Sequence, residues 1–255
     1  MSKEKKRCTA IVLAAGNGSR MKSTVAKQFM TLKGKPLIWY ALQVVQQSQL
    51  MDDCIVVTGA EDIAFVKDQI VDKYGFTKVD CIVAGGKERY ESVANALQAI
   101  ADGKQRIPNR DGYIVIHDGA RPFLTEKLLQ DTLEAAKAFH ACVAAVPSKD
   151  TVKLADKDGF ATQTPERNRI WNVQTPQVFD AKLIIEAYSQ LITQLPQLKE
   201  QGTMVTDDAG VVELFTDVKV KLVKSSYQNI KITTPEDLSV AEAFLSEREK
   251  VVTDF

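Results

Sequence analysis

Short runs of β-branched and aliphatic residues alternate with longer segments of helical periodicity through residues 1–147. The apolar runs predict strands that are buried on both faces, at residues 9–14, 54–59, 79–86, 113–120 and 141–147. The segments between them predict amphipathic helices, at residues 36–49, 61–74, 88–100 and 125–139. This alternation favours an α/β fold with a doubly wound, mainly parallel sheet and right-handed crossovers.

The alternation lapses over about residues 148–175. Within that stretch, residues 151–164 are typical of a hairpin whose turn is "DKDG". A hairpin inside a doubly wound fold cannot easily join the buried sheet, so we expect a protruding β-arm. Two further helices, at about 180–193 and 235–249, and a strand at 218–223 complete a chain in which we expect a single domain over residues 1–255.

The overall charge excludes some classes of partner. Lys+Arg and Asp+Glu each number 33, so no global field attracts nucleic acid or a membrane surface. No segment approaches the roughly 20 apolar residues that a membrane helix needs.

The four cysteines have no metal-like spacing, so we expect small buried apolar residues and a cytoplasmic protein. The basic start and the apolar run after it superficially resemble a signal peptide, but the run fits a first strand better.

A glycine-rich turn, "LAAGNGSRM", follows the first predicted strand. Backbone N–H groups in such a turn can surround phosphate oxygens, and Gly16 and Gly18 let the chain approach a ligand without a Cβ in the way. Arg20 and Lys27 add formal charge where a triphosphate would extend. The pattern predicts phosphate binding, and the alternative is a tight turn with solvated lysines.

The same turn departs from two known nucleotide-binding patterns. A dinucleotide fingerprint needs a small residue where Met21 stands and an acidic residue about 20 residues further on. Residues 5–51 contain no Asp or Glu, and a Walker A motif is absent from the sequence. The eight cations of that stretch are Lys5, Lys6, Arg7, Arg20, Lys22, Lys27, Lys33 and Lys35. These features argue against an NAD-dependent oxidoreductase.

Two further predicted strands end in polar or glycine-rich stretches, "VAGGKERYES" and "IHDGARP". Ligands of open α/β sheets bind beyond the carboxyl ends of the strands, so we expect these stretches to converge with the first turn. Asp118 lies three residues before Arg121 and is a natural position for Mg²⁺, directly or through water. The alternative for His117 and Asp118 is a structural hydrogen-bonded pair.

Seven motifs in order carry a family resemblance: "LAAGNGSRM…KQF", "GGKERYESV", "HDGARPF", "DTVK", "RNRIWNVQTPQVF", "TDDAG" and "NIKITTPEDL". Together they resemble the cytidylyltransferases that act on methylerythritol phosphate in the non-mevalonate isoprenoid pathway, from about Cys8 to Leu245. One departure is Ala26, where the family usually has proline. Ribitol-phosphate cytidylyltransferase shares some of the motifs, but "DTVK", Ala120 and Ile170-Trp171 favour the isoprenoid branch.

The resemblance implies a Rossmann-like nucleotidyltransferase fold and a reaction that transfers CMP from CTP to 2-C-methyl-D-erythritol 4-phosphate. The products are 4-diphosphocytidyl-2-C-methylerythritol and pyrophosphate. A phosphate monoester with a second pKa near ~6 is already dianionic at pH 7, so no general base is needed. That fits a chain with two histidines, His117 and His140.

The resemblance also implies roles for particular residues. CTP is expected to contact Ala14, Ala15, Gly16, Gly18, Ser19, Gly85, Gly86, Ser92, Asp118 and Gly119. Catalytic roles are expected for Arg20, Lys27, Arg167 and Lys231. The sugar-alcohol phosphate is expected to contact Arg121, Thr151, Thr175 and Thr206. Asp118 is also expected to hold Mg²⁺ or another divalent cation.

In the family the arm crosses to the neighbouring subunit, which implies a homodimer here. Thr151 and Arg167 lie on the expected arm and would complete the partner's site. Phe160 and Trp171 give the arm apolar anchors of the kind that interfaces favour. A non-catalytic nucleotide-binding protein is the remaining alternative, and the joint presence of Arg20, Lys27, Asp118 and Lys231 speaks against it.

Overall fold

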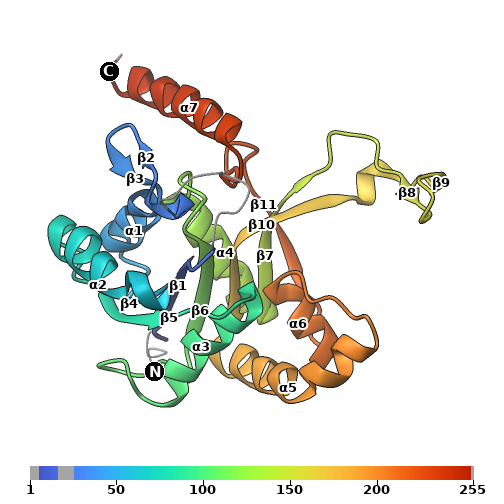
Figure 1. Cartoon of the computed structure of the whole chain (residues 1–255), viewed down its shortest axis with the longest axis horizontal. Coiled ribbons are helices and arrows are strands. Elements are labelled where there is room, and N and C mark those ends of the chain that lie inside the picture. The colour runs from blue at the N-terminus through green and yellow to red at the C-terminus, as the bar shows by residue number, and fades with distance from the viewer. Residues whose placement is uncertain (1–5, 17–25, 254–255) are drawn as a thin grey trace.

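The computed structural model describes residues 6–16 and 26–253, and a seven-stranded sheet in the order β11-β7-β10-β6-β1-β4-β5 forms its centre (Figure 1). The sheet strands are β1 (Cys8–Ala14), β4 (Asp53–Thr58), β5 (Val79–Ala84), β6 (Tyr113–Asp118), β7 (Ala141–Pro147), β10 (Trp171–Asp180) and β11 (Lys221–Lys224). Two small hairpins are β2 (Thr31–Leu32) with β3 (Lys35–Pro36), and β8 (Leu154–Ala155) with β9 (Ala161–Gln163). All five strands expected before residue 148 are confirmed.

Most of the sheet is parallel, as the sequence predicts. β1 pairs in parallel with β4 and β6, β4 pairs with β5, and β11 pairs with β7. The exception is β10, which lies antiparallel between β6 and β7. Strand β10 was not expected from the sequence, because its segment, "WNVQTPQVFD", is polar and contains Pro176. Pairing with a neighbour on each side makes this segment a strand, with a register shift between Val173 and Gln177.

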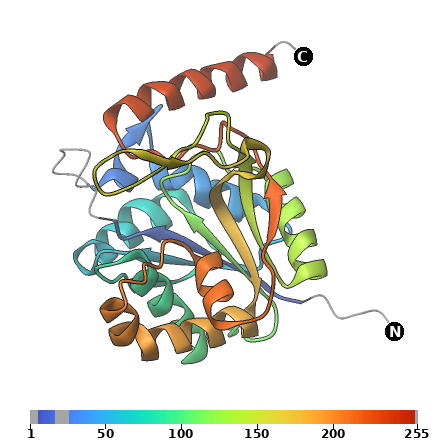
Figure 2. The same cartoon turned by 90° about the vertical axis from the view of Figure 1, so that its right-hand side faces the viewer.

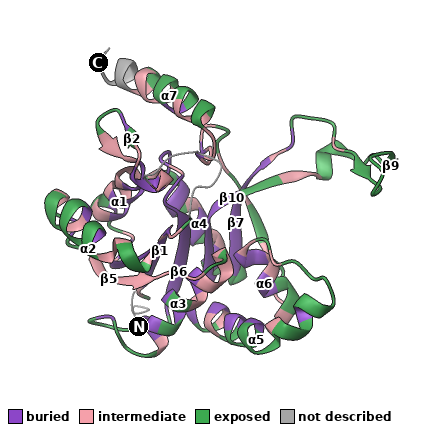
Figure 3. Ribbon diagram, in the orientation of Figure 1, coloured by how far each residue is buried: buried purple, intermediate pink, exposed green. Residues whose placement is uncertain are grey.

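Helices cover both faces of the sheet, which Figures 1 and 2 show from two directions. The helices are α1 (Leu37–Gln47), α2 (Ile63–Phe65), α3 (Arg89–Ala101), α4 (Glu126–Phe139), α5 (Ala181–Glu200), α6 (Asp208–Phe215) and α7 (Pro235–Thr253). Side chains of α1 and α4 pack on one face, and those of α3, α5 and α6 pack on the other. Side chains of β1 enter both helical layers. Ala10 and Val12 pack on the side of α1 and α4, and Ile11 packs on the side of α3, α5 and α6. The buried residues accordingly gather along the strands (Figure 3).

Local sequence signals explain several helix boundaries. Thr125 caps α4, since its hydroxyl accepts a hydrogen bond from Leu128 N at 3.2 Å. A capping box of Glu88 and Glu91 starts α3. Pro36 is the N-cap of α1 rather than a residue of its first turn.

Residues 61–74, expected to form one helix, combine α2 with a π-helical segment, Val66–Asp72. Helix α6 was not expected from the sequence.

The β8–β9 hairpin protrudes from the sheet as the expected arm (Figure 1). Its turn is held by the Asp156 carboxylate, which accepts hydrogen bonds from the backbone N–H groups of Asp158 and Phe160. Gly159 has φ +86°, a conformation that side chains disfavour. At the tip, Phe160 is 73% exposed.

The four cysteines are free thiols; Cys8, Cys54 and Cys142 are buried, and Cys81 is half-buried. In the described part of the chain, no helix combines the length and the apolar character that a membrane span requires.

Candidate active site

A cavity of about 230 Å³ opens at the carboxyl ends of β1 and β6, beside the loop that leads into α3. Its lining residues are Leu13, Ala14, Ala15, Gly16, Lys27, Gln28, Gly86, Lys87, Glu88, Arg89, Ser92, Asp118, Ala120 and Lys231. The Gln28 amide donates to the Ala14 carbonyl and so ties the short 3-10 helix Lys27–Phe29 to the end of β1. The described parts of the three stretches expected to converge lie around one cavity. Because residues expected to contact CTP line it, we call it the nucleotide cavity.

Glycines shape this cavity because other backbone and side-chain atoms lie very close to them. A Cβ on Gly85 would lie 2.3 Å from Ala15 Cβ, and one on Gly86 would lie 2.3 Å from Glu91 Cβ. A Cβ on Gly119 would lie 2.9 Å from the Leu13 carbonyl oxygen. Gly86 and Ala15 line the cavity itself, whereas Gly85 and Gly119 do not line it but lie against two residues that do, Ala15 and Leu13. Substitution at any of the three glycines would therefore displace the wall.

A second cavity of about 340 Å³ adjoins the first, and we call it the acceptor cavity because residues expected to contact the sugar-alcohol phosphate line it. It is lined by Arg89, Asp118, Arg121, Val173, Gln174, Thr175, Gln177, Thr206, Asp207 and Lys231. The two cavities share three lining residues, Arg89, Asp118 and Lys231. We call these three residues the seam. A ligand in each cavity would meet the other ligand there.

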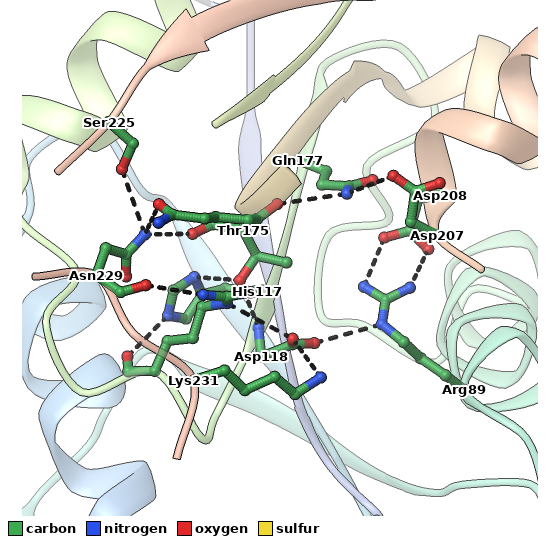
Figure 4. A network of polar contacts seen from close by, with 12 residues as sticks. Arg89, His117, Asp118, Thr175, Gln177, Asp207, Asp208, Ser225, Asn229 and Lys231 are labelled. Atoms are coloured by element: carbon green, nitrogen blue, oxygen red, sulfur yellow. Dashed lines mark hydrogen bonds and ion pairs between the residues drawn. The ribbon is translucent and has the colours of Figure 1, made fainter. Parts of the chain in front are cut away.

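The seam is an ionic cluster around the Asp118 carboxylate (Figure 4). Lys231 Nζ lies 2.8 Å from Asp118 Oδ2, Arg89 Nε lies 3.3 Å from Oδ1, and Arg121 Nε lies 3.8 Å from Oδ2. Burial alone would raise the pKa of Asp118, but the cations of Arg89, Lys231 and Arg121 hold it well below its usual range. The carboxylate is therefore charged at neutral pH.

A buried anchor fixes Arg89. Its Nη1 and Nη2 donate to the two carboxylate oxygens of Asp208 at 2.8 and 2.7 Å, a bidentate pairing. The Tyr188 hydroxyl also donates to Asp208. Although burial opposes it, Asp208 and Asp118 keep the pKa of Arg89 above its ordinary value.

His117 connects the seam to the acceptor cavity. Its Nε2 lies 3.1 Å from the Arg121 carbonyl, which can only accept, so Nε2 carries the hydrogen. Burial lowers the pKa of His117 to about 4, and in the neutral ring Nδ1 accepts from the Thr175 hydroxyl at 3.0 Å. That hydroxyl in turn accepts from Asp118 N–H at 3.0 Å. The contacts of His117 and Asp118 meet at the Thr175 hydroxyl, and the Asp118 side of this link lines both cavities.

The structure places most of the expected site residues around the two cavities. Those in the nucleotide cavity are Ala14, Ala15, Gly16, Lys27, Gly86, Ser92, Asp118 and Lys231. Those in the acceptor cavity are Arg121, Thr175 and Thr206. Thr151 and Arg167 are exposed on the arm and line neither cavity of the described chain. Gly18, Ser19 and Arg20 lie outside the described residues.

Arg89 and its anchor were not expected from the sequence. One signal could have found them: Arg89 is the first residue of α3, where the helix dipole disfavours a cation. An unfavourable charge at that position points to a compensating partner elsewhere. The partner, Asp208, lies on α6, which was not predicted.

The family model of 2-C-methyl-D-erythritol 4-phosphate cytidylyltransferase matches residues 8–247 of this chain. The chain belongs to that family. An enzyme of this name from Lachnoclostridium phytofermentans is 45% identical over 244 residues, covering 96% of this chain and 98% of the relative. Its namesake from Lachnospira eligens is 46% identical over 239 residues, covering 93% and 98%.

Solved structures agree with the family assignment. The crystal structure of 4-diphosphocytidyl-2C-methyl-D-erythritol synthase from Anaerococcus prevotii superposes with a TM-score of 0.78 at 35% identity, covering 94% of this chain and 96% of that one. The α/β nucleotidyltransferase fold and the CTP-dependent cytidylyltransferase activity expected from the motifs are thereby confirmed. The oxidoreductase, the non-catalytic protein and the ribitol-phosphate enzyme are not supported.

Proposed function

We propose that this chain joins the phosphate of 2-C-methyl-D-erythritol 4-phosphate to the α-phosphorus of CTP at the seam. The observation that carries this proposal is that the nucleotide and acceptor cavities share Arg89, Asp118 and Lys231. CTP occupies the nucleotide cavity, and the sugar-alcohol phosphate occupies the acceptor cavity. Their phosphates then meet among the cations of the seam, which offset the repulsion between two anions.

The reaction forms one phosphorus–oxygen bond and breaks another. A phosphate oxygen of the acceptor attacks the α-phosphorus, and the bond to the bridging oxygen of the β-phosphate breaks, so pyrophosphate leaves with the electron pair. The acceptor phosphate has a second pKa near ~6 and needs no base at neutral pH. His117 fits this scheme, because both its ring nitrogens are engaged in structural hydrogen bonds. Catalysis consists of positioning and charge stabilisation.

On the nucleotide side, the glycine turn holds the triphosphate and Lys27 stabilises charge at the α-phosphorus. Lys27 reaches the start of the turn, since a Cβ on Gly16 would lie 3.9 Å from Lys27 Cε. Arg20, outside the described residues, would add a second cation. Gly86 and Ser92 form the end of the cavity that faces the base, where Ser92 Oγ accepts from Gly86 N–H at 3.1 Å.

On the acceptor side, Arg121, Thr175 and Thr206 contact the sugar-alcohol phosphate. The partner subunit's arm completes this cavity in a homodimer, with Thr151 and Arg167 reaching the neighbouring site. Two features support the proposal: the arm extends from the sheet, and the apolar side chain of Phe160 is 73% exposed on it. An exposed aromatic on an extended arm is typical of an interface.

Asp118 would hold Mg²⁺ together with the CTP phosphates. Mg²⁺ commonly binds one or two protein carboxylates and completes its shell with phosphate oxygens and water. The Asp118 carboxylate fits this role because it faces both cavities and holds the Lys231 ammonium at 2.8 Å, so the site accommodates positive charge. A bound Mg²⁺ would neutralise phosphate charge, and Lys231 would then transfer from Asp118 to a phosphate.

We place this enzyme in the cytoplasm. The support is its four free thiols, of which three are buried. Free cysteines of this kind are typical of proteins in a reducing compartment.

The test is pyrophosphate release by the purified chain with Mg²⁺. We expect release with CTP and methylerythritol phosphate, and little with ATP or with ribitol 5-phosphate. Comparable turnover of ribitol 5-phosphate would contradict the proposed acceptor, and release with ATP at the same rate would contradict the proposed selectivity for cytosine.

A further inference from the structure

Arg89 is the most firmly held cation of the seam. Its guanidinium donates to both oxygens of Asp208 and to Asp118, whereas Lys231 has one ionic partner, Asp118, among the described residues (Figure 4). The Lys231 side chain is 34% exposed and can follow a ligand. Arg89 is fixed in place before a substrate arrives.

The anchor of Arg89 cannot move toward solvent. Asp208 is fully buried, with 0% exposure, and it receives the Tyr188 hydroxyl as a further donor. It also occupies the first position of α6, where the helix dipole favours a carboxylate. A buried carboxylate with these partners keeps its cation, because separating the pair would leave an uncompensated charge.

The geometry of Arg89 leaves two donors for a ligand. An arginine has five N–H groups, and the contacts to Asp208 and Asp118 use three of them. The two that remain are on Nη1 and Nη2. The side chain is 27% exposed and lines both cavities, so a phosphate at the seam can accept from these groups.

We propose that Arg89 is a catalytic residue that contacts the phosphates of both substrates at the seam, and that Asp208 and Tyr188 are positioning residues that hold it there. The proposal rests on the function proposed above. It assigns different roles to the two cations of the seam. Lys231 exchanges partners during turnover, and Arg89 provides a fixed positive charge where the two phosphates meet.

The decisive variant is Arg89→Gln combined with Asp208→Asn. Replacing only one partner leaves a buried charge unpaired and is strongly destabilising, whereas the double variant replaces the ion pair with two amides. Asp80→Asn combined with Arg106→Gln is the matched control. It removes another Asp–Arg pair, on β5 and a surface loop, and neither residue lines either cavity.

Three measurements are made on each variant: the melting temperature, the steady-state kinetics with both substrates, and CTP affinity by calorimetry. For the Arg89→Gln/Asp208→Asn variant we expect kcat to fall about 100-fold. Its CTP Kd should rise about tenfold, as for one lost charged hydrogen bond. The control should stay within about twofold in both quantities. Tyr188→Phe removes only a hydroxyl and should lower kcat about fivefold.

The outcomes separate the two proposals. If the double variant folds and keeps both kcat and CTP affinity within about twofold of wild type, the role of Arg89 is overturned. Weaker CTP binding with an unchanged kcat also overturns it, because Arg89 would then contribute to binding and not to the transition state. If the double variant does not fold, Tyr188→Phe decides, and an unchanged kcat overturns the proposal. If the wild-type chain releases no pyrophosphate, the proposed function fails; calorimetry then tests Arg89 alone, and an unaltered CTP affinity overturns its role.

Discussion

Lys231 Nζ lies 2.8 Å from Asp118 Oδ2, so a lysine near the C-terminal helix neutralises a carboxylate at the end of β6. Both residues line the nucleotide and the acceptor cavities. Because Lys231 is a flexible point charge with one ionic partner among the described residues, it can move from Asp118 to an incoming phosphate at little cost. The contact gives the Lys231 ammonium an ionic partner in the absence of a phosphate.

Asp118→Asn should raise the Mg²⁺ concentration needed for half-maximal activity by about tenfold or more, since a neutral amide is a weaker ligand for a hard cation. The measurement is the initial rate of pyrophosphate release as Mg²⁺ is varied at fixed CTP. Asp131→Asn, which alters a carboxylate paired with Lys127 on the surface of α4, is the control. Full wild-type activity in excess EDTA would contradict the proposed divalent cation.

Lys27→Ala should lower kcat far more than it weakens CTP binding. The Lys27 charge matters most when the α-phosphorus is crowded in the transition state, and loss of such a donor typically costs about 3–4 kcal/mol, or 10²–10³-fold. Steady-state kinetics and CTP calorimetry measure the two effects. Lys127→Ala, which removes an exposed lysine of α4, should leave both unchanged. An unaltered kcat would remove Lys27 from the catalytic residues.

The arm can be tested by subunit mixing. Arg167→Ala should raise the KM for methylerythritol phosphate or lower kcat while CTP affinity holds. Mixing this variant with Lys27→Ala should restore roughly a quarter of wild-type activity if subunits exchange freely, because half of the dimers carry one intact site and one doubly altered site. A mixture as inactive as its parents, with exchange verified by native mass spectrometry, would mean that Arg167 acts within its own chain.

The chain should lose stability as the pH falls from 7 to 5 in Mg²⁺-free buffer. Burial lowers the pKa of His117 to about 4 from 6.5, so the unfolded chain binds a proton in this window and the folded chain does not. The free energy of unfolding should therefore fall by about 2 kcal/mol between pH 7 and pH 5. Urea titrations at both pH values measure this change.

His117→Gln is the control for that titration. It cannot take up the proton, and its amide can still donate to the Arg121 carbonyl. The slope of stability against pH should be clearly shallower in this variant. An equal slope in both proteins would assign the effect to other groups. Asp118 does not interfere, because its lowered pKa makes its own contribution disappear only as the pH falls below the ordinary value of 3.8.

Local patterns in the sequence determined the framework of this protein. The apolar run of β1, the glycine turn after it and Asp118 at the end of β6 are each set by a few neighbouring residues. Because parallel strands end at a common edge, these patterns also predicted which stretches converge on the nucleotide cavity. The arm hairpin was also predictable, because its turn depends on the four neighbouring residues "DKDG".

Only the tertiary structure determined β10 and the anchor of Arg89. The segment Trp171–Asp180 is polar and contains a proline, and it forms a strand because β6 and β7 provide hydrogen-bonding partners on both sides. Arg89 and Asp208 are far apart in sequence, and their pairing depends on α3 and α6 packing on the same face of the sheet. Hydrophobic periodicity specifies which residues are buried, but not which distant charges come within hydrogen-bonding distance. Those contacts depend on three-dimensional packing. This is why the stretches around the nucleotide cavity could be predicted from the sequence, whereas the pairing of Arg89 with Asp208 could not.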